Sequence, residues 1–338
     1  ADVDPSHLAL YSASALVIDQ ETGAVLIEKQ PTEVVPIASI SKLMTAMVVL
    51  DAKLDMNEVI EIGDDDVDRQ KGTRSRLPVG ATMTRQTAML LALMSSENRA
   101  AHSLGRHYPG GMPAFVKAMN EKARALDMKH SSFEEPTGLS SNNVSTARDL
   151  ATIMQGALRY PLIRDILTTP NTVIQPASGS QRKIRLRSHN RLLPKQNGVQ
   201  VIGKTGYTRL AKRCFVGAAS NGDQEVIVAV LGARDLWGDA QRLVNYGLGR
   251  TSGSGYQLTE AEWHKVIQPS ETRGTSAAAL SRKCAGVRLV HEEGEVPPGL
   301  WDRAGAPEAE SGLSPAWLAF LPAVKMGWNL VKKFKGGK

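Results

Sequence analysis

The stretch "ASISKLMTAMVVL", residues 38–50, places Ser39 directly before a run of apolar residues at helical spacing, and Lys42 follows the serine by three positions. On a helix that begins at Ser39, Lys42 lies one turn further along the same face, while Leu43 and Met47 turn toward a core. Burial of the lysine removes its hydration, which lowers the pKa toward a value at which the amine accepts a proton. The stretch therefore fits a serine nucleophile with a lysine base.

The same spacing also fits a helix cap followed by a surface lysine. Ser180 and Lys183 repeat the pattern in a polar stretch that has no apolar helix behind it. Ser-x-x-Lys thus arises without any catalytic role, and the motif alone favours the cap.

Two further motifs change this interpretation. Ser96-Glu97-Asn98 follows an apolar run at the expected end of a helix, and Lys204-Thr205-Gly206 lies on an expected strand and occurs once in the chain. With residues 39–42 they form, in order, the active-site triplet of penicillin-recognising serine enzymes. The three motifs together favour the nucleophile over the cap.

The resemblance extends beyond the triplet. The stretches "ASISKLMTAMVVLDA", "LMSSENRAAHSLGRHYPGG", "EEPTGLSSNNVSTARDLA" and "KTGYTRLAKRCFV" resemble the low-molecular-weight penicillin-binding proteins, which are D-alanyl-D-alanine carboxypeptidases and endopeptidases. The second and third stretches resemble in particular the endopeptidase branch, penicillin-binding protein 7. The similarity covers about residues 10–248, whereas residues 250–338 show none.

The resemblance implies roles for matching residues in the acylation step. Ser39 is expected to attack a D-alanyl carbonyl, and Lys42 is expected to take its proton as the general base. Ser96 is expected to relay a proton toward the leaving amine, and Asn98 to hold both Lys42 and the peptide amide of the substrate. The backbone N–H groups of Ser39 and Tyr207 are implied to form the oxyanion hole.

The third motif is implied to bind substrate. Lys204 is expected to keep Lys42 neutral and to attract the substrate carboxylate, with Thr205 and Thr208 as hydroxyl partners and Gly206 in the same binding motif. No metal or other cofactor is expected. The seven histidines show no metal-ligand spacing, and two cysteines, Cys214 and Cys284, form neither a metal cluster nor a disulfide framework.

Strand signals lie at both ends of a helical middle region. A hairpin is predicted over 14–29, around Glu21-Thr22-Gly23, and another over 212–234, around Asn221-Gly222-Asp223. Apolar periodicity predicts helices over residues 85–106, 112–126 and 145–158. The last of these is expected to have a cap at Ser145 or Thr146. This pattern predicts an α+β fold, with one antiparallel sheet and an inserted helical subdomain at about 52–165.

The resemblance narrows that fold to the β-lactamase/transpeptidase-like type, in a catalytic domain over residues 1–250. Residues 251–312 are rich in Pro, Gly, Ser, Glu and Ala, which predicts an irregular or loosely ordered extension. Residues 313–338 combine apolar and aromatic side chains with lysines near the end, which fits an amphipathic helix. That helix either contacts an anionic membrane peripherally or packs on the main domain.

The composition limits the possible partners. The 41 basic and 34 acidic residues give a formal net charge of +7, which suits an anionic membrane surface or cell-wall polymer. No long Lys/Arg block is interleaved with aromatic residues, so a nucleic-acid partner is not expected. The chain starts at Ala1 without a methionine, as after removal of a signal peptide or after artificial shortening, and the resemblance favours a periplasmic location.

The predicted function is that of a serine DD-peptidase. It acts on peptidoglycan stem peptides through an acyl-enzyme at Ser39 and is acylated covalently by β-lactams. One alternative is a serine β-lactamase, but the sequence contains no convincing Glu-x-x-Leu-Asn segment to supply a deacylating base. The other is a non-catalytic cell-wall-binding protein of the same fold, which would not need a lysine base.

Overall fold

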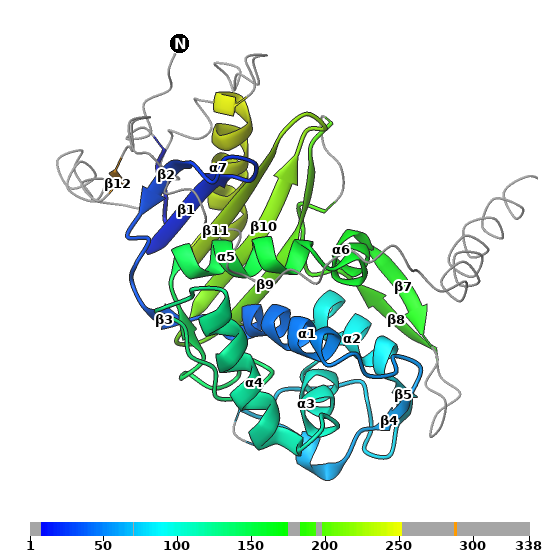
Figure 1. Cartoon of the computed structure of the whole chain (residues 1–338). Coiled ribbons are helices and arrows are strands. Elements are labelled where there is room, and N and C mark those ends of the chain that lie inside the picture. Colours follow the sequence, from blue (N-terminus) through cyan, green and yellow to red (C-terminus); the bar gives the residue numbers. More distant parts are fainter. Residues whose placement is uncertain (1–7, 70, 175–182, 194–197, 252–286, 289–338) are drawn as a thin grey trace, which may run out of the picture. The chain divides into compact units, whose positions relative to one another are not determined.

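The computed structural model describes residues 8–69, 71–174, 183–193, 198–251 and 287–288 (Figure 1). The chain divides into two compact units, and all of the described residues lie in the first, residues 1–294. The predicted helix over 313–338, most of the predicted irregular extension, Ser180 and Cys284 lie outside the described residues. No helix in the described part of the chain is long and apolar enough to cross a membrane.

One six-stranded antiparallel sheet joins the two ends of the catalytic region. Its strands, in spatial order, are β12 (Val287–Arg288), β2 (Val25–Lys29), β1 (Ser14–Asp19), β11 (Glu225–Ala233), β10 (Lys212–Ser220) and β9 (Gln200–Thr208). Leu16 of β1 lies opposite Ala229 of β11, so the N-terminal hairpin adds directly to the C-terminal one. Both predicted hairpins are confirmed, and their turn glycines have positive φ, +72° at Gly23 and +108° at Gly222.

The sheet separates two hydrophobic cores because successive side chains of a strand point to opposite faces. On β1, Ala15 and Val17 join the core beneath α7 (Leu236–Thr251), whereas Leu16 and Ile18 join the larger core beneath α5 (Ala147–Leu158). Figure 1 shows the two helices against opposite faces of the sheet. This layering confirms the predicted α+β class.

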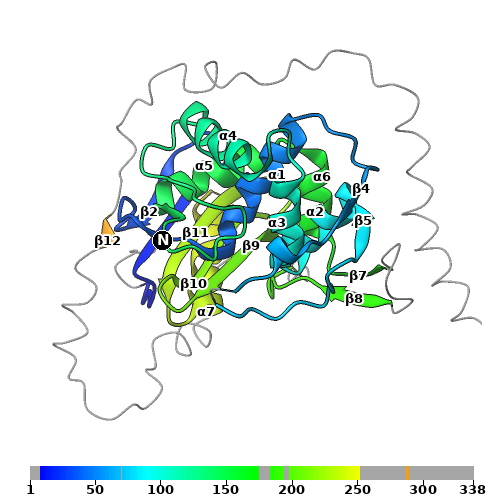
Figure 2. The same cartoon turned by 90° about the horizontal axis from the view of Figure 1, so that it is seen from below.

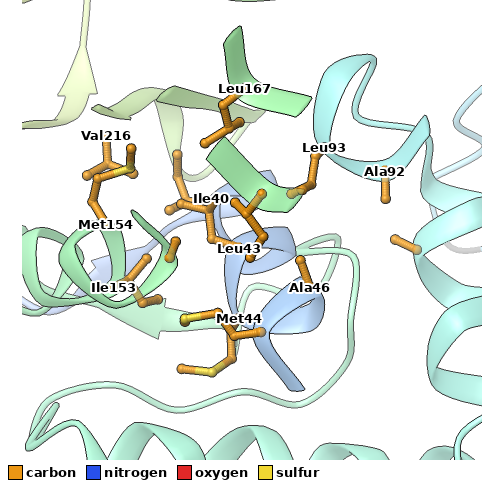
Figure 3. Close-up of a cluster of buried hydrophobic side chains, with 14 of the residues drawn as sticks. Ile40, Leu43, Met44, Ala46, Ala92, Leu93, Ile153, Met154, Leu167 and Val216 are labelled. Atoms are coloured by element: carbon orange, nitrogen blue, oxygen red, sulfur yellow. The ribbon is translucent and has the colours of Figure 1, made fainter. Parts of the chain in front are cut away.

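Helix α1 (Ser41–Asp51) is the centre of the helical layer (Figure 2). It packs against four further helices, α2 (Arg85–Met94), α3 (Asn98–Arg106), α4 (Gly111–Ala125) and α5. Because it is surrounded, all of its residues from Ser41 to Val49 are buried. Figure 3 shows Leu43 of α1 among apolar side chains that include Leu93 of α2 and Leu167 of α6 (Pro161–Thr168).

Two helix boundaries differ from the sequence-based prediction. The helix predicted over 85–106 is two helices, because the chain breaks between α2 and α3 at residues 95–97. Apolar periodicity continues across the break since both helices bury apolar side chains in one core. The helix expected to begin at Ser39 instead begins at Ser41, after a single 3-10 turn η2 (Ala38–Ile40).

Other helix predictions are confirmed more closely. The helix predicted over 112–126 is α4, and that predicted over 145–158 is α5. Thr146, not Ser145, caps α5, since its hydroxyl accepts a hydrogen bond from the backbone N–H of Asp149 at 3.0 Å. Such a cap stabilises a helix by about 1 kcal/mol.

The described residues also form three small two-stranded sheets. They are β3 (Val35–Pro36) with β6 (Val144–Ser145), β4 (Val59–Glu61) with β5 (Thr82–Thr84), and β7 (Asn171–Ile174) with β8 (Ile184–Arg187). A 3-10 turn, η3 (Asp64–Asp66), lies between β4 and β5. Helix α5, which lies within the predicted helical subdomain at about 52–165, packs on the main sheet. The boundaries of that subdomain therefore stay a prediction.

Candidate active site

Ser39 lies in the 3-10 turn η2, immediately before α1. The preceding residue, Ala38, has a positive φ of +49°, which is strained for a residue with a Cβ. The Oγ of Ser41 donates a hydrogen bond to the carbonyl of Ala38 at 2.9 Å and so fixes this turn. Ser39 provides no helix cap, because the N-cap residue of α1 is Ile40 and no side chain forms a capping hydrogen bond there.

Lys42 lies in the first turn of α1 and is fully buried. Its Nζ lies 2.9 Å from the Oγ of Ser39, 2.8 Å from the Oδ1 of Asn98 and 2.6 Å from the backbone carbonyl oxygen of Thr137. Burial lowers the pKa of Lys42 to about 8, although the negative charges of Glu135 and Glu97 oppose that shift.

The three partners of Lys42 differ in what they can donate. The carbonyl oxygens of Asn98 and Thr137 only accept hydrogen bonds, whereas the hydroxyl of Ser39 can also donate. A neutral amine has two N–H hydrogens and one lone pair. When the two carbonyls accept the two hydrogens, the lone pair is left for the proton of Ser39. The arrangement thus suits proton transfer from the serine to the lysine.

A second predicted lysine and serine also contact each other. The Nζ of Lys204, on β9, donates to the Oγ of Ser96 at 2.9 Å and to the carbonyl of Thr205 at 2.9 Å. Burial lowers the pKa of Lys204 well below its ordinary value, and the nearby charge of Lys42 lowers it further. Ser96 lies in the break between α2 and α3, with φ at +58°. The break turns its hydroxyl toward Lys204.

Two glycines let neighbouring segments come close to the turn that carries Ser39. A Cβ added at Gly206 of β9 would lie 2.8 Å from the carbonyl oxygen of Ile37 and 3.1 Å from the backbone nitrogen of Ser39. A Cβ added at Gly138 would lie only 1.9 Å from the carbonyl oxygen of Ala38. Both contacts are too close for a side chain, so glycine allows β9 and the loop 134–140 to close on Ser39.

A cleft of about 910 Å³ opens at this site. Five of the predicted site residues line it: Ser39, Ser96, Thr205, Gly206 and Tyr207. Arg187, Arg191 and Arg213 also line it, and no carboxylate does among its described lining residues. The cleft therefore has a positive lining that suits an anionic ligand.

The remaining predicted residues lie elsewhere. Lys42, Asn98 and Lys204 are not among the residues that line the cleft, and they support Ser39 and Ser96 through the hydrogen bonds described above. The hydroxyl of Thr208 accepts a hydrogen bond from the backbone N–H of Ala211 at 3.0 Å. Thr208 thus shapes the turn between β9 and β10 and does not line the cleft.

Comparison with known proteins identifies the family. The sequence matches the family described as D-alanyl-D-alanine carboxypeptidase over residues 2–235. The chain belongs to this D-alanyl-D-alanine carboxypeptidase family. The predicted resemblance and the predicted class, a serine-type D-Ala-D-Ala peptidase, are confirmed.

Individual relatives agree with the predicted branch. The chain is 46% identical over 242 residues to a D-alanyl-D-alanine endopeptidase of Pseudomonas aeruginosa, covering 71% of this chain and 78% of that protein. It is 43% identical over 241 residues to one of Escherichia coli, covering 70% and 77%. The crystal structure of the Streptomyces K15 DD-transpeptidase superposes with a TM-score of 0.67 at 27% identity, covering 71% and 98%. These similarities confirm the predicted fold type.

Within this family member, sequence reasoning missed part of the site around Lys42. The carbonyl of Thr137 contacts Lys42, and the carboxylate of Glu135 accepts hydrogen bonds from the backbone N–H groups of Thr137 and Gly138, both at 2.6 Å. The side chain of Asn143 donates to the hydroxyl of Ser41 at 3.0 Å. The "EPTGLS" stretch was the available signal, but a backbone carbonyl contact leaves no residue-type signature.

The described residues contain no group of three or more histidines, cysteines or acidic residues placed to hold a metal ion. Cys214 is buried, has no disulfide partner in the described part of the chain, and lies opposite Gly206 on the neighbouring strand. Burial raises the pKa of its thiol to about 11, so Cys214 stays a protonated thiol near neutral pH.

The close approach of Gly138 to the turn that carries Ser39 gives a testable prediction. Gly138→Ala is expected to lower the free energy of unfolding by about 3 kcal/mol or more, because the Cβ forces the carbonyl of Ala38 to move as well as straining φ. Gly80→Ala is a matched control, since φ is +81° at Gly80 and +80° at Gly138 but no atom lies within 4 Å of the Gly80 Cβ position. Urea denaturation measures both, and equal losses would contradict the close contact.

Proposed function

We propose that this protein is a D-alanyl-D-alanine endopeptidase that cleaves peptidoglycan cross-links through an acyl-enzyme at Ser39. The observation that carries the proposal is the environment of Lys42, whose buried amine contacts the Oγ of Ser39 while carbonyl groups occupy its other positions. This arrangement supplies the base that a serine hydroxyl needs near neutral pH.

In the proposed reaction, the Oγ of Ser39 attacks the D-alanyl carbonyl carbon and its proton passes to Lys42. The backbone N–H groups of Ser39 and Tyr207 stabilise the resulting oxyanion, and loss of such a donor typically costs about 3 kcal/mol. The C–N bond then breaks as Ser96 relays a proton to the leaving amine. Water attacks the ester carbonyl carbon and loses a proton to Lys42. As the C–O bond to Ser39 breaks, Lys42 returns that proton to the Oγ, which releases the acid and restores the Ser39 hydroxyl and the neutral lysine.

The proposed substrate fits the charge of the cleft. Peptidoglycan stem peptides carry several carboxylates, and the arginines that line the cleft complement them. We propose that the carboxylate beside the scissile bond lies against Thr205 in the cleft, where Lys204 supports the backbone of Thr205 from behind. The predicted contacts of substrate with Lys204 and Asn98 would require these two residues, which do not line the cleft, to become accessible. A β-lactam resembles the D-Ala-D-Ala end, so it is expected to acylate Ser39 as well.

Carboxypeptidase action is the second candidate. Some relatives at lower identity are named carboxypeptidases, among them one of Bacillus subtilis that is 31% identical and one of Mycobacterium tuberculosis that is 30% identical. The endopeptidase is preferred because both relatives above 40% identity described here are named endopeptidases. None of these names is that of a β-lactamase or of a non-catalytic binder.

Incubation with purified muropeptides tests the proposal. Cross-linked dimers are expected to be converted to monomers faster than a pentapeptide monomer loses its terminal D-Ala, as read by mass spectrometry. Ser39→Ala is the control and should leave both substrates intact. Loss of D-Ala without cleavage of dimers would instead establish a carboxypeptidase. A stable β-lactam adduct without either product would support the non-catalytic cell-wall-binding protein. Rapid release of that adduct would support the β-lactamase.

The expected periplasmic location agrees with a cell-wall substrate and stays a proposal. The expected membrane contact through residues 313–338 also stays a proposal, because that segment lies outside the described residues.

A further inference from the structure

Asn98 presents the two ends of its amide to different partners. Its Oδ1 accepts a hydrogen bond from Lys42 at 2.8 Å, and its Nδ2 donates to the Oγ1 of Thr73 at 3.1 Å. Thr73 belongs to none of the three catalytic motifs. It lies in the loop that runs from η3 to β5, about 25 positions before Asn98 in the chain.

The hydroxyl proton of Thr73 is directed away from Asn98. The Oγ1 of Thr73 lies 2.8 Å from the Oδ2 of Asp68, which also accepts from the backbone N–H of Thr73 at 3.0 Å. An ionised carboxylate only accepts hydrogen bonds, so the hydroxyl of Thr73 donates to Asp68. The oxygen of Thr73 therefore presents a lone pair to Asn98. Only the NH₂ end of the amide can donate a hydrogen bond to that lone pair.

The orientation of this amide determines what the lone pair of Lys42 can do. With Oδ1 toward Lys42, the neutral amine donates its two hydrogens to Asn98 and Thr137, and its lone pair can accept the proton of Ser39. With the amide reversed, Nδ2 would point at Lys42 and compete with Ser39 for that lone pair. Its Oδ1 would also face the lone pair of Thr73.

We propose that Asp68 and Thr73 are positioning residues that lock the amide of Asn98 with its oxygen toward Lys42, and so reserve the lysine lone pair for Ser39. This lock, formed by Asp68, Thr73 and Asn98, acts through hydrogen bonds alone, and Asp68 and Thr73 touch no substrate. The proposal rests on the proposed role of Lys42 as the base.

The loop that carries the lock is tied to the other side of the lysine. The Oδ1 of Asp68 accepts from the backbone N–H of Lys71 at 2.9 Å, and the ammonium of Lys71 donates to the carbonyl of Leu139. Leu139 follows Thr137 by two positions, in the loop whose carbonyl contacts Lys42. The loop from η3 and the loop 134–140 thus support Lys42 from two directions.

Thr73→Val tests the lock, because it removes the hydroxyl and keeps the branched shape. The second-order rate of acylation by a fluorescent penicillin is expected to fall about tenfold at pH 7, as for loss of a buried hydrogen bond. The midpoint of the pH–rate profile is expected to move to lower pH, because an amide NH₂ end near Lys42 disfavours its ammonium. Thr73→Ser keeps the hydroxyl and should stay within about twofold of the wild-type rate.

Ser75→Ala is the matched control for a general weakening of the loop. The Oγ of Ser75 accepts from the backbone N–H of Leu77 at 3.0 Å, in the same loop but without contact to Asn98. It should leave both the rate and the profile unchanged. An equal loss in Thr73→Val and Ser75→Ala, an unshifted profile in Thr73→Val, or failure of Thr73→Ser to restore the rate would overturn the lock. Absence of any adduct on the wild-type protein would instead reject Ser39 and Lys42 themselves.

Discussion

Ser39→Ala is expected to abolish acylation by β-lactams and cleavage of muropeptides. Without the Oγ no acyl-enzyme forms, and removal of a serine nucleophile lowers turnover by about 10⁴-fold or more. Intact mass spectrometry after incubation with penicillin should show one adduct on the wild-type protein and none on the variant. The fold should survive, because Ser39 is partly exposed in the cleft.

The second Ser-x-x-Lys pattern provides a matched control for this experiment. Ser180→Ala removes the serine of that pattern and should leave the yield of the adduct at the wild-type level. An adduct that persists on Ser39→Ala would show that another residue is acylated. Loss of the adduct in Ser180→Ala would identify Ser180 as the acylated serine in place of Ser39.

Lys42→Met is expected to lower the acylation rate by about 10²- to 10⁴-fold, the range that loss of a general base gives. The wild-type rate should also depend on pH in a defined direction. Because only the neutral amine accepts the serine proton, and the pKa of Lys42 is about 8, the rate should rise as the pH passes from 7 to 9. About a tenth of the lysine is neutral at pH 7 and about nine tenths at pH 9. Stopped-flow measurement with a fluorescent penicillin checks both expectations.

Lys183→Met serves as the control, because Lys183 is exposed and has the same spacing from Ser180 that Lys42 has from Ser39. Its rate and pH profile should match those of the wild type. A wild-type rate already at its maximum at pH 6 would exclude Lys42 as a base that must lose a proton first.

Local chemistry explains which elements of the fold could be predicted. The late hairpin depends on a turn at Asn221 and Gly222 between two runs of apolar residues, and each of these signals lies within a few positions. Helix α5 is similar, with a capping threonine followed by apolar periodicity. The motif at residues 96–98 indicated a helix end, but the apolar periodicity over 85–106 did not show the break at residues 95–97, because α2 and α3 bury apolar residues on both sides of it in one core. Periodicity reports burial and not the continuity of a helix.

The candidate site also has a part that the sequence could predict and a part that it could not. The three motifs are defined by side-chain identity, so the sequence alone points to Ser39, Ser96 and Lys204. The carbonyl of Thr137 and the lock through Thr73 depend on loops that meet only after folding. The hydrogen bond of Thr208 to the backbone N–H of Ala211, within the turn after β9, also appears only in the folded chain.

The sequence by itself therefore determined the family and the class of reaction and predicted Ser39 as the nucleophile, because motif residues in a given order indicate a chemistry whatever their surroundings. Only the tertiary structure decided the surroundings of Lys42, the proposed base. Its pKa near 8 results from burial within the helical layer, and the direction of its lone pair results from two carbonyl groups that lie 56 and 95 positions away in the chain. Burial and hydrogen-bond direction are properties of packed neighbours, and no stretch of sequence around Lys42 contains those neighbours.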